Sequence, residues 1–304
     1  LDYNTLCGMT RAEIEATFSP ELEALAVKSN ATCRQVMDRL TRQYDGYRFT
    51  KDEEFTSMYN PFSVLSALQK RSYGNYWFAS GTPTFLVEML QKTDFDLREM
   101  EGIEVNEASL SDDRADINNP IPMIYQSGYL TIKDYDERFR MYTLGFPNEE
   151  VKYGFLNFVS PFYTPIAQTD TSFYIGKFIR ELESGDVDAF LTRLRCFFAG
   201  IPYDLNDRTE RHYQTVFYLV FQLMGQFTET EVRSARGRAD AVVKTPDYIY
   251  VFEFKLNDSA EAALRQIDEK GYLLPYQADG RKVVKVGVAF EKEERNIGEW
   301  VIGE

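Results

Sequence analysis

The sequence predicts an α/β protein in two parts, and three observations predict it. Apolar residues recur at helical spacing through most of the first half of the chain. Two strand-like runs then stand between helical segments at about residues 120–160. After residue 170 the order is helices, strands, a helix and strands, which is typical of a layered α/β domain. Residues 160–170, "SPFYTPIAQTD", hold two prolines and no periodic pattern, so we place the boundary there, giving domains 1–165 and 166–304.

Composition limits the class of protein. The 304 residues are 44% hydrophobic and 15% aromatic, which is enough apolar surface for folded cores and too much for a disordered chain. No apolar stretch is long enough to cross a bilayer and no signal-peptide pattern opens the chain, so we expect a soluble, cytoplasmic protein without a membrane partner. The chain opens on Leu1 inside a segment that looks packed, so we expect a fragment of a longer protein.

The net charge of −14 counts against an extended nucleic-acid surface, because neutralising phosphates requires clustered lysine and arginine. One run departs from this background: "EVRSARGRAD" places Arg236 and Arg238 directly before Asp240. Basic residues beside an acid suit a phosphate substrate held near a metal ion, and they equally suit a solvated charged strand. The sequence leaves both interpretations open.

Helices in the first half are marked by their N-terminal residues. "TRAEIEATF" has Thr10 as a candidate N-cap with Glu13 three residues later, which is a capping-box pattern. "TCRQVMDRLTRQY" and "NPFSVLSALQK" carry apolar residues three and four apart, and Pro61 lies in the first turn of the second run. "TPTFLVEMLQK" predicts one more short helix.

Residues 120–160 contain strand-like patterns between helical ones. After a helix end come the strand "YLTIKDY", the charged turn "DERF", the strand "RMYTLGF" and a helix from Asn148. A helix, a two-stranded wing and a helix are the outline of a winged-helix module. The wing carries acids as well as bases, so its charge does not favour binding to DNA phosphates.

The second half begins with the helices "FYIGKFIRELESG", "DVDAFLTRLRCFFAG" and "DRTERHYQTVFYLVFQLMG". Three or four strands follow, then the helix "SAEAALRQIDEKGY" and a final pair of strands, "KVVKVGVAF" and "GEWVIG". Among these elements, "GRADAVVKTPDYIYVFEFKL" predicts a β-hairpin with its turn at Pro246 and Asp247. Asp240 then lies opposite Glu253, and Lys255 faces the same way because side chains alternate along a strand.

Two carboxylates placed opposite each other repel, and a sheet gains nothing from this unless a cation lies between them. A hard divalent ion such as Mg²⁺ accepts oxygen ligands from one or two carboxylates and keeps several waters. Lys255 could then hold a water or stabilise a phosphate transition state, so this trio suits metal-assisted phosphodiester hydrolysis. The alternative is a chance acid pair relieved by Lys255 and Arg238 in a surface salt-bridge ladder.

Asp240 followed by Glu253-Phe254-Lys255 at the end of an apolar strand resembles the D…(D/E)xK core of the PD-(D/E)XK nuclease superfamily. That resemblance implies a restriction-endonuclease-like α/β fold with a mixed central sheet. The second half is similar to the nuclease-like C-terminal domain of a bacterial group, abundant in Bacteroides, whose N-terminal portion is an AAA-ATPase-like domain. "YDGYRF", "YNPFSVLSAL" and "YTLGFPNEEV" resemble the later part of that ATPase-like region, its helical lid and winged helix.

The resemblance implies a Mg²⁺ or Mn²⁺ site with Asp240 and Glu253 as metal ligands and Lys255 as the catalytic lysine. Glu210 matches the extra acid on the first helix of the fold, and Gln266 lies where RecB-type relatives carry a glutamine and tyrosine motif. Both are therefore further catalytic candidates. A helix N-terminal acid and an exposed amide are their alternative interpretations.

Candidates for binding the substrate are Arg236, Arg238, Lys270 and Tyr272. The last two follow Gln266 at a spacing that departs from the RecB pattern. No GxxxxGK[ST] motif occurs in the chain, so ATP is not expected to bind this fragment, and the missing ATPase portion is expected as its partner in the full protein. Two functions remain open: a metal-dependent nuclease acting on nucleic acid, with DNA favoured, and a non-catalytic interaction or effector module built on a nuclease fold.

Overall fold

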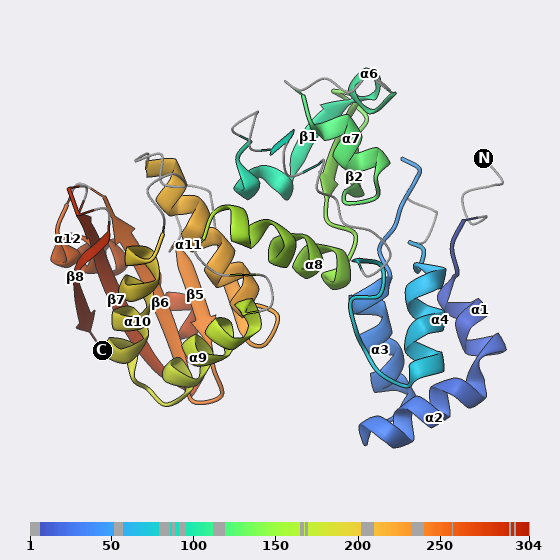
Figure 1. The fold of residues 1–304 in the computed structure, drawn as a ribbon, viewed down its shortest axis with the longest axis horizontal. Helices are drawn as coiled ribbons and strands as arrows, with labels where there is room; N and C mark the ends of the chain where they lie inside the picture. Colours follow the sequence, from blue (N-terminus) through green and yellow to red (C-terminus); the bar gives the residue numbers. More distant parts are fainter. Residues whose placement is uncertain are drawn as a thin grey trace. The chain divides into compact units, whose positions relative to one another are not determined.

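The computed structural model divides the chain into two compact units, Leu1–Phe155 and Leu156–Glu304 (Figure 1). The division falls within helix α8 (Glu149–Val159), before the boundary predicted at residue 165. The structure describes residues 7–51, 57–78, 86, 89–90, 95–111, 119–164, 167, 170–201, 210–232, 240–256, 258–291, 293–294 and 296–303, with 210–213 described by their backbone alone.

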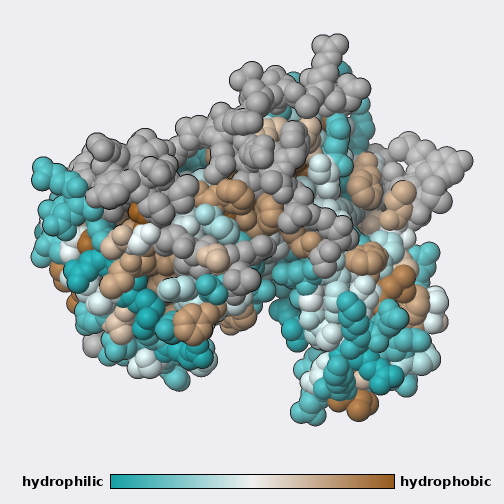
Figure 2. Space-filling view, in the orientation of Figure 1, coloured by the Kyte–Doolittle hydropathy of each residue, from teal (hydrophilic) through white to brown (hydrophobic). Residues whose placement is uncertain are grey.

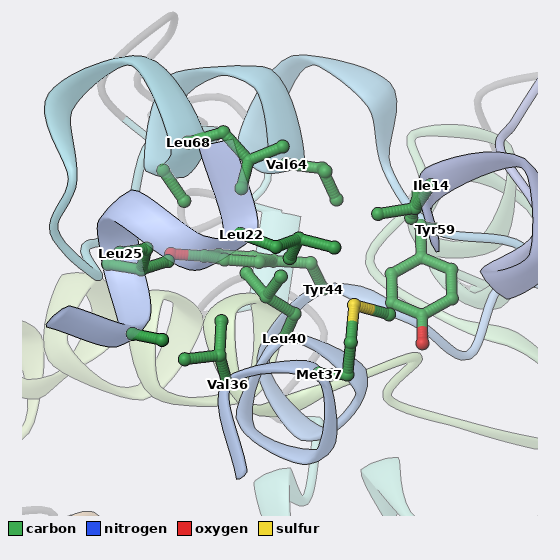
Figure 3. Close-up of a cluster of buried hydrophobic side chains, with 12 residues drawn as sticks. Ile14, Leu22, Leu25, Val36, Met37, Leu40, Tyr44, Tyr59, Val64 and Leu68 are labelled. Carbon is green, nitrogen blue, oxygen red and sulfur yellow. The ribbon is translucent and has the colours of Figure 1, made fainter. Parts of the chain in front are cut away.

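The first unit begins with four helices: α1 (Arg11–Thr17), α2 (Ser19–Ser29), α3 (Cys33–Tyr44) and α4 (Pro61–Lys70). Thr10 and Glu13 form the predicted capping box of α1, and Thr32 and Gln35 form another at α3. The helices enclose a core that Figure 3 shows in close-up, which includes Ile14, Leu22, Leu25, Val36, Met37, Leu40, Tyr44, Tyr59, Val64 and Leu68. The predicted helix "TPTFLVEMLQK" lies largely outside the described residues.

The rest of the first unit contains a three-stranded antiparallel sheet in the order β1-β3-β2. Its elements are the 3-10 helix η2 (Leu97–Met100), β1 (Ile103–Asn106), α6 (Glu107–Ser111), α7 (Ile121–Gln126), β2 (Thr131–Asp136), β3 (Met141–Gly145) and the start of α8. The β2–β3 hairpin confirms the two predicted strands, and β1 adds a third strand that the sequence did not predict. The winged-helix assignment stays a prediction.

The second unit is a mixed α/β layer structure. Its elements are η3 (Ser160–Phe162), α9 (Thr171–Glu183), α10 (Val187–Ala199), α11 (Glu210–Met224), β4 (Glu229–Val232), β5 (Ala241–Lys244), β6 (Tyr248–Lys255), α12 (Ala260–Glu269), η4 (Leu274–Tyr276), β7 (Lys282–Glu291) and β8 (Asn296–Gly303). The five strands form one sheet in the order β4-β5-β6-β7-β8. Among the described strands of this sheet, only the β6–β7 pair is parallel, and α12 connects these two strands.

The two faces of the sheet have different coverings. Phe252 of β6 packs against Phe190 of α10 and Phe221 of α11, with ring centroids 5.7 and 5.2 Å apart. On the same face the Tyr250 hydroxyl donates a 2.6 Å hydrogen bond to the carbonyl of Leu182 in α9. Helix α12 covers the other face, where Ile267 and Tyr272 pack with Val242, Ile249 and Val251. Strand alternation therefore separates an aromatic core from the face that carries Asp240 and Glu253.

Gly287 lets α12 lie very close to the sheet. It is the residue of β7 paired with Glu253 of β6. A Cβ atom at this position would lie 2.2 Å from the carbonyl oxygen of Ala260 and 2.8 Å from the backbone nitrogen of Leu264. Because both obstacles are helix backbone, no side-chain rotation can relieve them.

Gly287→Ala is therefore expected to destabilise the protein by about 1–3 kcal/mol or more, because α12 must move off the strand. Urea unfolding followed by circular dichroism measures the loss. Gly176→Ala in α9 is the matched control, since its Cβ would meet only the flexible end of Arg180, at 3.4 Å. Because alanine is favoured over glycine inside a helix, Gly176→Ala should leave the free energy of unfolding unchanged or raise it slightly. Equal unfolding midpoints for Gly287→Ala and wild type would contradict the close packing.

Exposed large apolar side chains occur in both units, among them Val27, Phe62, Phe139, Phe173, Phe227 and Leu274. On the face drawn in Figure 2, the hydrophobic patches are small and lie among hydrophilic residues. Single exposed apolar residues of this kind are normal for a folded protein. Within the described ranges, no helix combines the length and the apolar character needed to cross a bilayer.

Candidate functional site

Asp240 and Glu253 meet as the sequence predicts. Ala241 pairs with Phe252 in the antiparallel β5–β6 ladder, which confirms the predicted register. Asp240 directly precedes β5, and its Oδ2 accepts a 2.9 Å hydrogen bond from the backbone N–H of Phe254. This bond ties Asp240 to the strand that carries Glu253 and Lys255.

Glu253 is almost completely buried, with 3% of its surface exposed. Its Oε1 accepts a hydrogen bond from Nε2 of Gln266 and lies 3.6 Å from Nζ of Lys255. Its Oε2 is buried and has no hydrogen-bond partner among the described residues. A buried unpaired carboxylate oxygen carries a desolvation cost. A bound ligand would offset this cost, and the described side chains do not supply one.

Gln266 completes the group from helix α12. Its Oε1 accepts a hydrogen bond from Nζ of Lys255, while its Nε2 donates to Glu253. The side chains of Glu253, Lys255 and Gln266 therefore form one polar cluster on the α12 face of the sheet. Asp240 lies beside this cluster, close enough for its charge to act on Glu253. Only 4% of the Glu253 side chain is exposed, so Glu253 is not a surface carboxylate of the kind that a surface salt-bridge ladder contains.

Burial makes the ionised forms of both acids unfavourable. It raises the pKa of Glu253 to about 7, and the charge of Asp240 adds to this effect, while Lys255 and the nearby backbone N–H of Asp240 oppose it. Burial also raises the pKa of Asp240, against the hydrogen bond from Phe254 and the charge of Lys255. Two neighbouring acids whose pKa values are both raised are typical of a site that receives a cation.

Comparison with known proteins agrees with this geometry, because residues 208–300 match the PD-(D/E)XK nuclease superfamily. Residues 208–300 form a PD-(D/E)XK domain. The chain is also 32% identical, over 309 residues, to an uncharacterised protein in the vnfD 5' region of Azotobacter chroococcum mcd 1. That match covers 99% of this chain and 57% of the relative, so the chain spans little more than half of the relative's length. No solved structure matches the chain significantly.

Members of the PD-(D/E)XK superfamily generally use Mg²⁺ or Mn²⁺. Within the described ranges no group of three or more His, Cys, Asp or Glu residues gathers as a metal cluster. Asp240 and Glu253 nevertheless fit such an ion: they provide hard carboxylate oxygens, and Oε2 of Glu253 is buried without a partner. Two carboxylates are enough for Mg²⁺, which keeps waters in its remaining positions.

The raised pKa of Glu253 predicts how stability depends on pH in the metal-free PD-(D/E)XK domain. The unfolded chain releases this proton near pH 4.5 and the native state near pH 7, so between these values the native state binds more protons. The free energy of unfolding should therefore fall as pH rises through this window, by an amount on the order of 3 kcal/mol. Urea unfolding in EDTA at several pH values measures this slope.

Glu253→Gln should reduce that slope, since the amide does not titrate. Glu269→Gln, on the exposed side of α12, is the matched control and should keep it. An unchanged slope in Glu253→Gln would show that other groups produce the pH dependence.

The structure describes some of the remaining predicted site residues of the PD-(D/E)XK domain and not others. Glu210 begins α11, and only its backbone is described. Arg236 and Arg238 lie outside the described residues. Lys270 is exposed at the C-cap of α12. Tyr272 is only 9% exposed, and burial raises its pKa while a hydrogen bond with Gln266 opposes the shift.

Sequence reasoning missed one residue of the site's surroundings, Gly287, and one set of contacts, those of Gln266. It placed Gln266 near the site by resemblance and did not predict that this amide contacts both Glu253 and Lys255. It also missed Gly287, although a glycine inside the apolar run "KVVKVGVAF" is a signal for close approach of another backbone.

Proposed function

We propose that the PD-(D/E)XK domain is a Mg²⁺- or Mn²⁺-dependent nuclease that hydrolyses phosphodiester bonds of DNA. The observation that carries this proposal is the meeting of Asp240 and Glu253, with one buried carboxylate oxygen left unpartnered and Lys255 beside them. Repulsion between the acids is best relieved by a bound cation.

In this mechanism Asp240 and Glu253 hold the ion through carboxylate oxygens. When bound, the ion supplies positive charge to the scissile phosphate and makes a nearby water easier to deprotonate. Lys255 holds the attacking water and stabilises the negative charge that develops on the phosphate oxygens. Water adds to phosphorus, the P–O bond to the leaving group breaks, and the water's proton leaves toward solvent or the leaving oxygen.

Other residues have supporting roles in the proposal. Glu210 contributes a further acid from the start of α11, and Gln266 contacts the acids and the lysine. Arg236, Arg238 and Lys270 bind the phosphates of the nucleic acid, and Tyr272 lines the site. The full-length protein couples this domain to an AAA-like ATPase portion, which supplies or regulates the substrate.

The direct test is nicking of supercoiled plasmid and decay of labelled single-stranded DNA in Mg²⁺, in Mn²⁺ and in EDTA. We expect cleavage that depends on the divalent ion. A well-folded protein that neither binds Mn²⁺ nor cuts either substrate would overturn the proposal.

A non-catalytic interaction module is the second candidate, and the charges around the sheet favour it. Lys244 lies 3.4 and 3.5 Å from carboxylates of Glu229 and Glu231, and Lys285 lies 2.9 Å from Asp268. These lysines are already paired with acids, and the net charge is −14. A folded protein without nuclease activity that captures a protein partner through this domain would favour the second function.

A further inference from the structure

Gln266 is the residue of the site whose contacts are hardest to explain by packing alone. A side-chain amide has one donor end and one acceptor end. Here the donor end faces the Glu253 carboxylate and the acceptor end faces the Lys255 ammonium. Both ends are thus matched to the charge that each contacts.

The direct contact between Glu253 and Lys255 is weak by comparison. Their side chains lie on the same face of β6, yet Nζ and Oε1 are 3.6 Å apart, which is longer than a hydrogen bond. Gln266 therefore takes the hydrogen bonds that the lysine and the carboxylate would otherwise exchange with each other. The lysine is held beside the carboxylate without closing onto it.

The hydrogen bond from Gln266 also makes the two carboxylate oxygens of Glu253 different from each other. Oε1 is occupied by Gln266 and faces Lys255, whereas Oε2 is buried and without a partner among the described residues. Oε2 is consequently the oxygen available to a cation.

Helix α12 holds Gln266 firmly in this place. Ala263 and Ile267, which flank it on the buried side of the helix, are both fully buried. The Ser259 side chain caps the helix by accepting a 3.2 Å hydrogen bond from the backbone N–H of Ala262. Gly287 admits the helix backbone to the strand that pairs with β6. The amide is thus carried by a rigid element and not by a loop.

We propose that Gln266 is a positioning residue that holds Lys255 off Glu253 and thereby leaves Oε2 of Glu253 free to bind the divalent ion. This inference rests on the proposed metal-dependent function. It concerns the metal-binding step, so binding of Mn²⁺ alone, without DNA, is a sufficient probe.

Gln266→Leu should weaken Mn²⁺ binding by about 10- to 100-fold, as is usual when a hydrogen-bond partner of a metal ligand is removed. The reason is that Lys255 then pairs directly with Glu253 and competes with the ion. Titration calorimetry with Mn²⁺ gives the affinity, and circular dichroism shows that the variant is folded. Gln277→Leu makes the same chemical change at an exposed position and should bind as wild type does.

Gln266→Asn covers the case in which leucine prevents folding. It keeps the amide but is one methylene shorter, so it cannot bridge both partners, and its Mn²⁺ affinity should also fall. A role for Gln266 in stability alone would lower the melting temperature and leave the Mn²⁺ affinity of the folded variant unchanged.

A double-mutant cycle with Lys255→Ala separates positioning from an independent contribution. If Gln266 acts by restraining Lys255, Gln266→Leu should cost much less Mn²⁺ affinity in the Lys255→Ala background than in wild type. The same fold-change in both backgrounds would overturn the inference. If wild type binds Mn²⁺ and Gln266→Leu binds it equally well, the inference about Gln266 is overturned but the proposed function is not. Wild type that binds no Mn²⁺ would overturn the proposed function and this inference with it.

Discussion

Asp240→Asn is expected to abolish Mn²⁺ binding and DNA cleavage together. The amide has the shape of the carboxylate and its oxygen can still accept the hydrogen bond from the Phe254 N–H, so the hairpin should keep its structure. It lacks the negative charge that attracts a divalent ion to the pair formed with Glu253. Titration calorimetry with Mn²⁺ and plasmid nicking, performed on the same preparation, measure the two losses.

Asp247→Asn provides a matched control for this variant. Asp247 lies in the exposed turn of the same β5–β6 hairpin, so the change removes an identical charge away from the site. It should bind Mn²⁺ and cut DNA as wild type does. Retained Mn²⁺ binding in a folded Asp240→Asn protein would show that Asp240 is not a metal ligand.

Lys255→Ala is expected to keep Mn²⁺ binding and to lose about 10²- to 10³-fold in the rate of DNA cleavage. That loss is the size expected for removing one contact made in the transition state. Binding of Mn²⁺ should be retained or strengthened, because the change removes a positive charge 3.6 Å from the Glu253 carboxylate. Single-turnover cleavage at saturating Mn²⁺ separates the rate of the chemical step from metal affinity.

Lys285→Ala is the control for the loss of a lysine. Lys285 lies on the neighbouring strand β7 and is paired with Asp268 of α12, outside the acid pair. It should cut DNA at the wild-type rate. Equal cleavage by wild type, Lys255→Ala and Asp240→Asn would instead indicate a contaminating nuclease and would contradict the assignment of the site.

The parts of the fold that depend on local sequence were predictable. The capping boxes at Thr10 and Thr32 fix helix starts through contacts within four residues. The hairpin register follows from strand alternation and one turn, so the meeting of Asp240 and Glu253 was predictable as well. In each case the determining contacts lie close together in the chain.

The parts that depend on distant segments were not predictable in the same way. The sequence does not show that β1 joins the β2–β3 hairpin, nor that β6 pairs in parallel with β7 across α12. The contacts of Gln266 depend on how far α12 stands from the sheet, which the small size of Gly287 determines. The burial of Glu253, and with it the raised pKa, exists only once this helix covers the strand.

The alternation of strand β6 constrains how the chain can change without losing the site. Tyr250 and Phe252 point into the aromatic core, while Val251 and Glu253 point toward α12. One inserted or deleted residue between them would exchange the two sets, placing a carboxylate among phenylalanine rings and an aromatic ring in the polar cluster. Substitutions, by contrast, affect one face at a time. Functional relatives of this domain should therefore vary in the composition of this strand and keep its length, and length changes should collect in turns such as that at Pro246 and Asp247.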